Sequence, residues 1–191
     1  LDLAAVHIGT SNEIVVASSS GGRTIYRNAG DTRRSGIELA YTAQWARDWR
    51  THVALSTLNA RFADSFAASG GTVASGNRIP GTVDKTVFAE VVWQPASVPG
   101  LQAAVEMVHQ GSMVVNDLNT DKTSAATTFN LRVGLEQKLG GWRLREYLRL
   151  DNATNRSYVG SVIANDGNGR FFEPAPGRTW SVGLMASYAF R

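Results

Sequence analysis

The chain has 191 residues, of which 19 are Lys or Arg, 16 are Asp or Glu and none is Cys. This length suits a single domain with a sizeable core. The absence of Cys excludes a disulfide scaffold and thiolate metal sites, and a net charge of +3 is too small to indicate nucleic acid binding. No segment approaches the roughly 18 apolar residues that a membrane-spanning helix needs. No signal peptide opens the chain, so we expect that it was removed or that Leu1 lies within a larger protein.

Alternation of apolar and polar side chains predicts eight β-strands. We expect the first strand to run from Leu1 into the region 13–16, and the second to include residues 36–45. The other six strands are expected over residues 49–56, 82–93, 101–110, 128–139, 142–152 and 178–190. Because side chains on a strand point alternately to its two faces, most of these segments have one apolar face and one polar face.

The last strand has the most regular alternation in the chain. Its apolar face consists of Trp180, Val182, Leu184, Ala186, Tyr188 and Phe190. The opposite face is small and mostly polar. A soluble edge strand with so many exposed apolar side chains would promote aggregation, whereas a barrel strand between lipid and a wet lumen needs this pattern. The sequence therefore predicts an all-β protein, a transmembrane antiparallel β-barrel.

The predicted connections are of two kinds. The short ones are residues 46–48, 95–100 and 140–141. The long ones, rich in Gly, Ser, Asn and Thr, lie near residues 18–27, 65–79, 112–126 and 153–177. Loops beyond about 12–15 residues are uncommon in compact soluble domains, but short turns at one rim and long loops at the other are normal for outer-membrane barrels.

The five Trp residues all lie at ends of predicted strands. Those beside the short turns are Trp45, Trp49, Trp93 and Trp142, and Trp180 begins the last strand at the long-loop side. Trp favours the bilayer interface, where its ring is buried and its N–H stays hydrated. We interpret these residues as an aromatic girdle.

Glu146 does not fit this pattern. It shares the apolar face of the seventh strand with Leu144 and Leu148. A charge near the middle of a membrane is costly, although less so for Glu than for Arg or Lys. We therefore expect a bulge, or a shielded position, at Glu146.

Five segments resemble motifs of one protein family. They are residues 28–39, 58–62, 76–81, 151–160 and 173–178 with the strand that follows. In this order and spacing they cover most of the chain and resemble the C-terminal part of the barrel of TonB-dependent outer-membrane receptors. Two departures are Ala153-Thr154, where the family usually has Leu-Phe, and Arg191, which follows the aromatic Phe190 that usually ends the barrel.

The resemblance implies a barrel of 22 strands around an N-terminal plug, of which residues 1–191 would supply about eight strands. It implies import of a ferric siderophore or a similar metal chelate across the outer membrane, which is transport and not catalysis, without a cofactor. The expected partners are outer-membrane lipid, the receptor's own plug, TonB (through the TonB box of an N-terminal region outside this chain) and the barrel-assembly machinery. The identity of the chelate does not follow.

Three groups of residues are candidates for function. Charges expected in the lumen, where they would hold the plug or simply form local ion pairs on a wet wall, are Glu38, Glu90, Arg132, Glu136, Arg143, Arg145 and Arg149. Arg170, Phe171 and Phe172 lie in a long loop, where they would grip an anionic aromatic chelate, anchor the last strand or pack against a neighbour. The apolar face of the last strand would serve as the barrel-assembly signal.

The sequence also bears on metal sites and on two alternative functions. His7, His52 and His109 lie on different strands without ligand spacing, so we expect no metal site. The stretch that begins at Asp166 lacks the further acidic ligands of a calcium loop, so we expect a flexible turn. One alternative is a complete eight-stranded barrel with a structural or adhesive role, because eight strands suffice for closure. Another is a barrel enzyme that acts on lipid or peptide.

Overall fold

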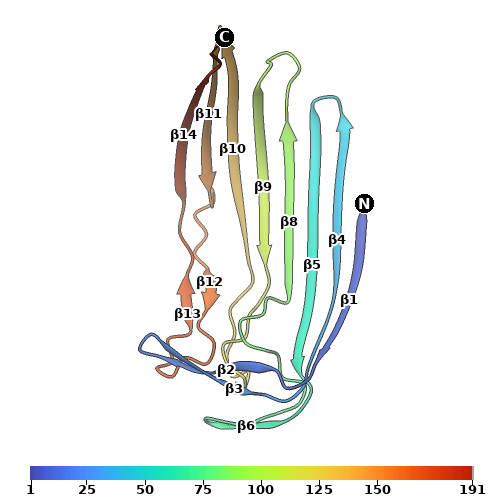
Figure 1. Ribbon diagram of the computed structural model, residues 1–191, viewed down its shortest axis with the longest axis vertical. Helices are drawn as coiled ribbons and strands as arrows, with labels where there is room; N and C mark the ends of the chain where they lie inside the picture. Colours follow the sequence, from blue (N-terminus) through green and yellow to red (C-terminus); the bar gives the residue numbers. More distant parts are fainter. Residues whose placement is uncertain (191) are drawn as a thin grey trace.

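The computed structural model describes residues 1–190, which contain strands and no helix. None of these residues therefore forms a helix long and apolar enough to cross a membrane. Eight strands form one antiparallel sheet in the order β1-β4-β5-β8-β9-β10-β11-β14 (Figure 1). Their bounds are β1 Asp2–Thr10, β4 Thr32–Ala46, β5 Trp49–Phe62, β8 Lys85–Trp93, β9 Leu101–Gln110, β10 Ala126–Leu139, β11 Trp142–Asp151 and β14 Thr179–Tyr188.

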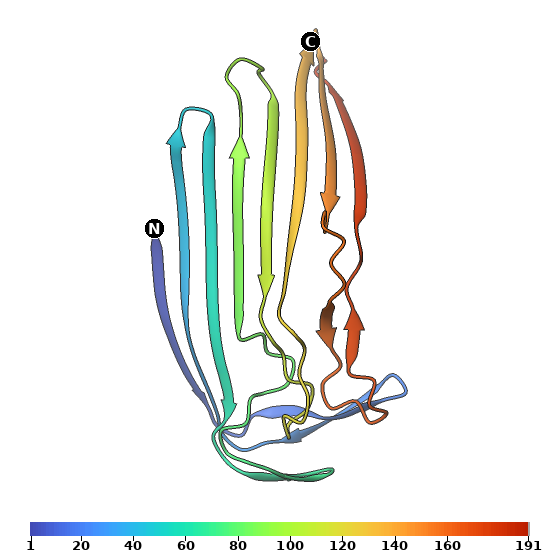
Figure 2. The same cartoon turned by 180° about the vertical axis from the view of Figure 1, so that it is seen from behind.

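The two rims of the sheet differ as the sequence predicts. Short connections join β4 to β5, β8 to β9 and β10 to β11 at the rim that is uppermost in Figure 1, which we call the short-turn rim. The tightest is Gly140-Gly141, where Gly140 takes a φ of +60°, a conformation that glycine adopts at little cost. The long connections gather at the other end, the long-loop rim (Figure 2).

The strand register assigns every side chain to one of two faces. On one line across the sheet, Val182 pairs with Leu148, which pairs with Val133. The line continues through Ala103 to Trp93 and Trp49. Paired residues point to the same side of a sheet, so the predicted apolar faces of separate strands join into one continuous surface, which we call the outward face.

Aromatic side chains of the outward face lie together at the short-turn rim. Trp45 stacks on Trp49 with ring centroids 5.5 Å apart, and Trp49 lies 6.1 Å from Trp93. Trp142 lies 5.0 Å from Tyr188. These rings form the half of the predicted girdle that belongs to this rim.

The expected extent of the first strand is wrong. β1 ends at Thr10, and Asn12 then takes a φ of +56°, which interrupts the extended chain. Residues Ile14–Ser20 form β2, which pairs with β3 (Arg23–Asn28) in a hairpin of the long-loop rim. The apolar pattern there has a different cause, since Val15 packs against a buried cluster and not against lipid.

Of the two arrangements expected at Glu146, the bulge is absent, and the half-buried side chain agrees with a shielded position. β11 pairs with β10 and β14 without a register shift, and Glu146 lies opposite Leu135 and Leu184 on the outward face. A bulge would leave ladder hydrogen bonds unmade on two strands. The half-buried Glu146 side chain instead lies on the outward face, and the backbone of β11 keeps its regular pairing.

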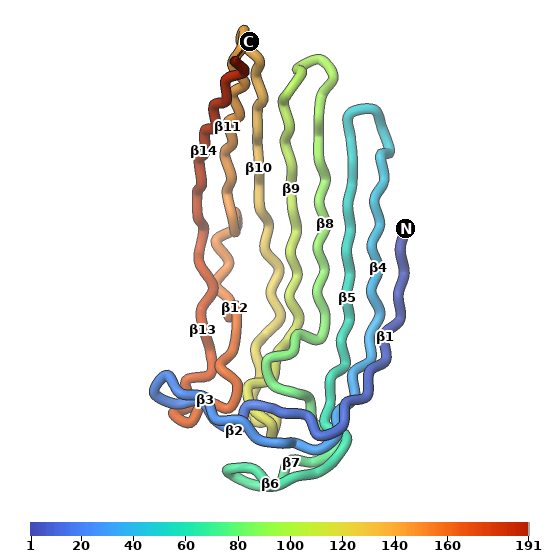
Figure 3. Tube along the Cα trace, in the orientation of Figure 1, coloured from blue at the N-terminus to red at the C-terminus, as the bar shows by residue number. Residues whose placement is uncertain are grey.

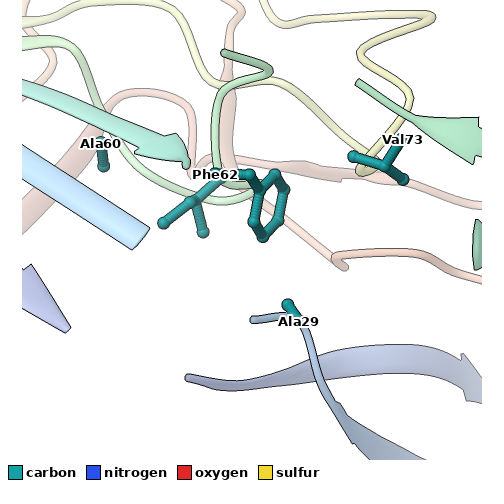
Figure 4. Close-up of a cluster of buried hydrophobic side chains, with 5 residues drawn as sticks. Ala29, Ala60, Phe62 and Val73 are labelled. Carbon is teal, nitrogen blue, oxygen red and sulfur yellow. The ribbon is translucent and has the colours of Figure 1, made fainter. Parts of the chain in front are cut away.

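The buried core lies at the long-loop rim and not along the sheet. Three of the four long connections fold back as hairpins: β2–β3, β6–β7 (Phe66–Ala68 and Gly71–Val73) and β12–β13 (Val159–Val162 and Phe172–Pro174). Beneath them, the end of β5 and the loops bury a cluster that comprises Ala29, Ala60, Phe62, Val73 and Ile79 (Figure 4). Apolar burial therefore holds the loops to the sheet.

The eight-stranded sheet is open. β1 and β14 form its two edges and do not pair with each other. The alternative of a self-contained eight-stranded barrel requires that pairing, so it is wrong for residues 1–190.

Candidate functional site

The face opposite the outward face carries a ladder of ion pairs across β8, β9, β10 and β11. Arg132 pairs with Glu90 and lies 3.6 Å from Glu106. Arg149 donates two hydrogen bonds to the Glu106 carboxylate, at 2.9 and 2.7 Å, and a third at 2.8 Å to Asp151. We call this surface the inner face. Each charge of the ladder has a partner of opposite sign, as a partly desolvated surface requires.

A second, more exposed cluster lies on the inner face near the short-turn rim. Glu136 lies 2.7 Å from Arg145 and 3.5 Å from Arg143, whose side chains are about half exposed. Six of the seven predicted lumen charges thus form ion pairs with one another or with Glu106. Within residues 1–190, Glu38 has no such pair.

Glu106 is the charged residue of the inner face that the sequence analysis missed. It is only 6 % exposed and also accepts a hydrogen bond of 3.2 Å from Asn130. Asn130 in turn accepts a bond of 2.9 Å from the backbone N–H of Asn152, which ties the wall to the start of a long loop. The inner face of β9 mixes Ala104 and Val108 with Gln102, Glu106 and Gln110, and the sequence analysis located this strand without assigning its faces.

The long loops interlock as one unit, the loop cap (residues 11–31, 63–84, 111–125 and 152–178). The first loop crosses from one edge of the sheet to the other, where β2 meets the loop before β14 (Figure 3). Asn165 lies at this junction. Its side chain donates to the Val16 carbonyl at 2.7 Å and accepts from the Asp117 backbone N–H at 3.0 Å.

A buried ion pair lies in the middle of the loop cap. Asp117, which is 2 % exposed, pairs with Arg27 of β3. The Arg27 guanidinium also lies 4.7 Å from the ring centroid of Phe66 and donates to the Ala67 carbonyl at 3.3 Å. Three loops therefore meet on one arginine, which fixes their relative positions.

Another ion pair fastens the first loop to the sheet. The Glu13 carboxylate accepts bonds of 2.9 and 2.8 Å from Arg34 and one of 2.7 Å from the Thr32 hydroxyl. The hydrogen bonds from Arg34, against an opposing effect of burial and with further help from Thr32, lower the pKa of Glu13 from 4.5 to about 2. Glu13 is therefore ionised at any physiological pH.

A cavity of about 260 Å³ lies inside the loop cap, with a lining drawn from all four loops. Phe171 lines it beside Arg27 and Asp117, and its ring meets that of Phe172 edge to face at 6.5 Å. Arg170 and Phe172 are exposed and do not line this cavity, and the Arg170 backbone N–H binds the Asp166 carboxylate at 2.6 Å. The three predicted ligand contacts thus lie in the cap, but only Phe171 faces the cavity.

The last strand presents its predicted face as one surface. Its members from Trp180 to Tyr188 pair in register with outward residues of β11. Phe190 lies beyond the end of β14, is 91 % exposed, and its ring lies 5.0 Å from that of Tyr188. Arg191 lies outside the described residues. No group of three or more His, Asp or Glu side chains among residues 1–190 is placed to hold a metal ion.

Comparison with known proteins assigns this sheet to a family. A family model described as TonB dependent receptor-like, beta-barrel matches residues 1–155. The chain belongs to the TonB-dependent receptor family. Barrels of this family are outer-membrane β-barrels, so the outward face is the lipid-facing one, the short-turn rim is periplasmic and the long-loop rim is extracellular.

Several solved structures share the fold at low sequence identity. The ferric preacinetobactin receptor BauA of Acinetobacter baumannii superposes with a TM-score of 0.72 at 15 % identity over 96 % of this chain. The ferric yersiniabactin uptake receptor FyuA of Yersinia pestis gives 0.70 at 19 % over 99 %, and the copper transporter OprC gives 0.61 at 18 % over 98 %. The chain spans about a quarter of the length of these proteins, covering 26 %, 27 % and 28 % of them respectively.

The family assignment confirms the predicted fold class, the resemblance to TonB-dependent receptors and the outer-membrane location. TonB-dependent receptors are transporters and not enzymes, so a barrel enzyme has no support. The contacts of the lumen charges with a plug, of the loop residues with a ligand and of the last strand with the assembly machinery stay predictions.

Proposed function

We propose that residues 1–191 are the C-terminal part of the barrel of an outer-membrane receptor that imports a ferric siderophore or a similar metal chelate. The observation that carries the proposal is the family match over residues 1–155, supported by the fold shared with ferric siderophore receptors over nearly the whole chain. The plug, the TonB box that engages TonB and the remaining strands would be contributed by the rest of the receptor.

In this function the inner face forms part of the passage. The ladder around Glu106 would keep its charges paired while the plug moves. Glu38, and Arg143 and Arg145 through exchange of their half-exposed pairs with Glu136, would bind the plug. Charged side chains remain solvated in a wide lumen, so such contacts can form and break at modest cost.

The loop cap would contribute to chelate capture at the cell surface. Phe171 offers a ring at the cavity and Arg170 supplies a cation nearby, the combination that stacks on and neutralises an anionic aromatic chelate. The outward face of β14, with Phe190 exposed beyond its end, would be read by the barrel-assembly machinery during insertion.

The proposal is tested by growth of a strain that lacks the full-length receptor gene, supplied with one iron source at a time, together with uptake of each labelled chelate. Loss of uptake of one ferric chelate in the deletion strain, its restoration by the gene and its dependence on TonB would support the proposal. A parallel arm with copper is needed, since one structural neighbour is a copper transporter. If no metal chelate is taken up differently, the proposal is wrong.

The loop contacts have a separate test in the complemented strain. Phe171→Ala and Arg170→Ala should each raise the chelate concentration for half-maximal uptake several-fold, because each loses a stacking or charge contact. Arg23→Ala, at an exposed position of the first loop, is the matched control. Equal uptake by all three variants would remove these residues from the ligand site.

A further inference from the structure

Basic residues interrupt the outward face near the extracellular rim. Arg33 of β4 lies directly opposite Arg61 of β5, and Lys85 of β8 lies opposite Thr57 of β5. All three basic side chains are exposed and share the face that holds Ile37 and the other lipid-facing residues. Like charges opposite each other across two strands are destabilising unless an anion lies between them.

No side chain of the described residues supplies that anion. The ion pairs within residues 1–190 involve none of Arg33, Arg61 and Lys85. The outward faces of β1, β4, β5 and β8 carry no carboxylate at all. Asp84, which precedes Lys85, is already bonded to Arg78 at 3.4 Å and to Ser112 at 2.9 Å.

The position of these residues along the membrane normal can be measured from the Trp residues of the periplasmic rim. Arg33 and Arg61 each lie about 12 residues along their strands from Trp45 and Trp49, roughly 40 Å of strand at about 3.3 Å per residue. With a strand tilt of about 40°, that is a rise of about 30 Å, enough to pass the apolar band of roughly 25 Å and reach the outer headgroups. Lys85 is lower, about 8 residues from Trp93, but a lysine extends upward along apolar surface.

The surroundings of Arg61 form a shallow, polar recess. A depression of about 540 Å³ is lined by Arg61 with Ser35, Thr57 and Asn59 of the same outward face, and also by the ion pair of Arg78 with Asp84. Asn59 accepts a hydrogen bond of 2.7 Å from Arg61 Nε, and the Gly76 carbonyl accepts one of 2.5 Å from Nη1. These bonds hold the guanidinium in place and leave Nη2 free of protein partners within residues 1–190.

We propose that Arg33, Arg61 and Lys85 form a site for the phosphate groups of the glycolipid that makes up the outer leaflet. Arginine matches phosphate with two parallel N–H donors and lysine adds a point charge. The acyl chains would cover the apolar part of β4, β5 and β8 below, and the phosphates would relieve the repulsion between Arg33 and Arg61. The site faces away from the lumen, so it is independent of whatever the receptor imports.

The test uses the full-length receptor in detergent micelles with two probes, lipid A that carries both phosphates and lipid A from which they have been removed. Wild-type receptor should bind the phosphorylated lipid preferentially in native mass spectrometry and in titrations. A basic residue near an anionic lipid surface contributes about fivefold to affinity, so Arg33→Gln/Arg61→Gln should weaken binding by about 25-fold. Arg33→Lys/Arg61→Lys should restore most of it.

The matched control is Arg23→Gln/Arg47→Gln, which removes two exposed arginines from a loop hairpin and from a periplasmic turn. It should bind as wild type does. A heat-dependent shift in gel mobility verifies that each barrel is folded. Equal wild-type binding of both lipids, or equal loss in the control, would overturn the proposal.

Discussion

The charged side chains of the inner face differ widely in solvent exposure, and therefore in how much free energy is lost when an ion-pair partner is removed. The side chain of Glu106 is 8 % exposed and that of Arg149 is 30 % exposed, while those of Glu136 and Arg143 are 33 % and 49 % exposed. Removal of one partner is costly only when the other stays desolvated, so the two pairs should respond differently to mutation.

Arg149→Ala should lower the free energy of unfolding by about 1–3 kcal/mol, between the values typical of surface and buried pairs, because Glu106 then faces only Arg132 at 3.6 Å and Asn130. Arg143→Ala should cost clearly less, because both members of its pair with Glu136 stay in contact with water. Urea unfolding of the full receptor in lipid vesicles measures both. Equal losses would contradict the assigned difference in burial.

Glu13 makes the attachment of the first loop sensitive to acid. Its pKa is lowered by folding, so the folded protein binds fewer protons than the unfolded chain and the stabilisation is complete above pH 4.5. It is lost as the pH falls to about 2. Pepsin should therefore cleave residues 11–31 more slowly in wild type than in Glu13→Gln at pH 4.5, with the difference vanishing near pH 2. A difference that persists unchanged to pH 2 would refute this role.

At the scale of elements, each strand is two-sided, and the facing is testable by single charges. Val182→Arg, Leu184→Arg and Leu131→Arg should each destabilise the barrel by up to about 2–4 kcal/mol where they lie near mid-membrane, whereas the neighbouring Ser181→Arg faces the lumen and should be mild. The yield of folded, heat-modifiable receptor in outer membranes reports the effect. Equal tolerance of all four would mean that the facing is wrong.

A few side chains, each bonded to more than one loop, hold the loops together. Asn165→Gly removes both bonds of the Asn165 amide but suits the φ of +54° at this position. Exchange of amide hydrogens in residues 14–20 should accelerate by about 5- to 30-fold, the equivalent of roughly 1–2 kcal/mol. Asn155→Gly, at a φ of +52° in the same loop, should leave these residues unchanged. If both variants behave alike, Asn165 is not the junction.

Sequence patterns predicted strands more accurately than loops, for a physical reason. The lipid and the lumen act on every strand alike, so alternation located seven of the eight sheet strands. The first strand was overextended because Val15 is apolar for a different purpose, contact with the cluster around Phe62. Hairpins within the long loops were not predicted, since their partners lie on distant loops: Arg27 and Asp117 are 90 residues apart in sequence.

The charged residues of the candidate site were predicted where the facing of their strand was clear, and were missed elsewhere. Charges opposite a clearly apolar face, such as Arg132 and Glu136, were assigned correctly to the inner face. Glu106 was missed because the inner face of β9 mixes apolar and polar residues, so its faces were not assigned. Arg33, Arg61 and Lys85 were missed because no facing was assigned to the strand ends where they lie. Which charges pair depends on strand register, which alternation alone does not fix.

At the scale of the whole molecule, the open sheet has an outward face, an inner face and two unpaired edge strands, β1 and β14. Its charges are sorted accordingly, with the acids of the sheet on the inner face except Glu146 and the unpaired basic residues Arg33, Arg61 and Lys85 at the outer rim. Such sorting has no use in a soluble protein, where both faces meet either water or a packed core. The central claim is therefore that the outward face contacts lipid and the inner face contacts water.

Spin labels test this claim most directly, because the chain has no Cys and accepts single cysteines. In the full receptor in native outer membranes, labels at Leu131 and Val182 should be accessible to oxygen dissolved in hydrocarbon. Labels at Ser181 and Ser187 should be accessible to water-soluble paramagnetic reagents. Water contact at Leu131 and Val182, with hydrocarbon contact at Ser181 and Ser187, would contradict the account.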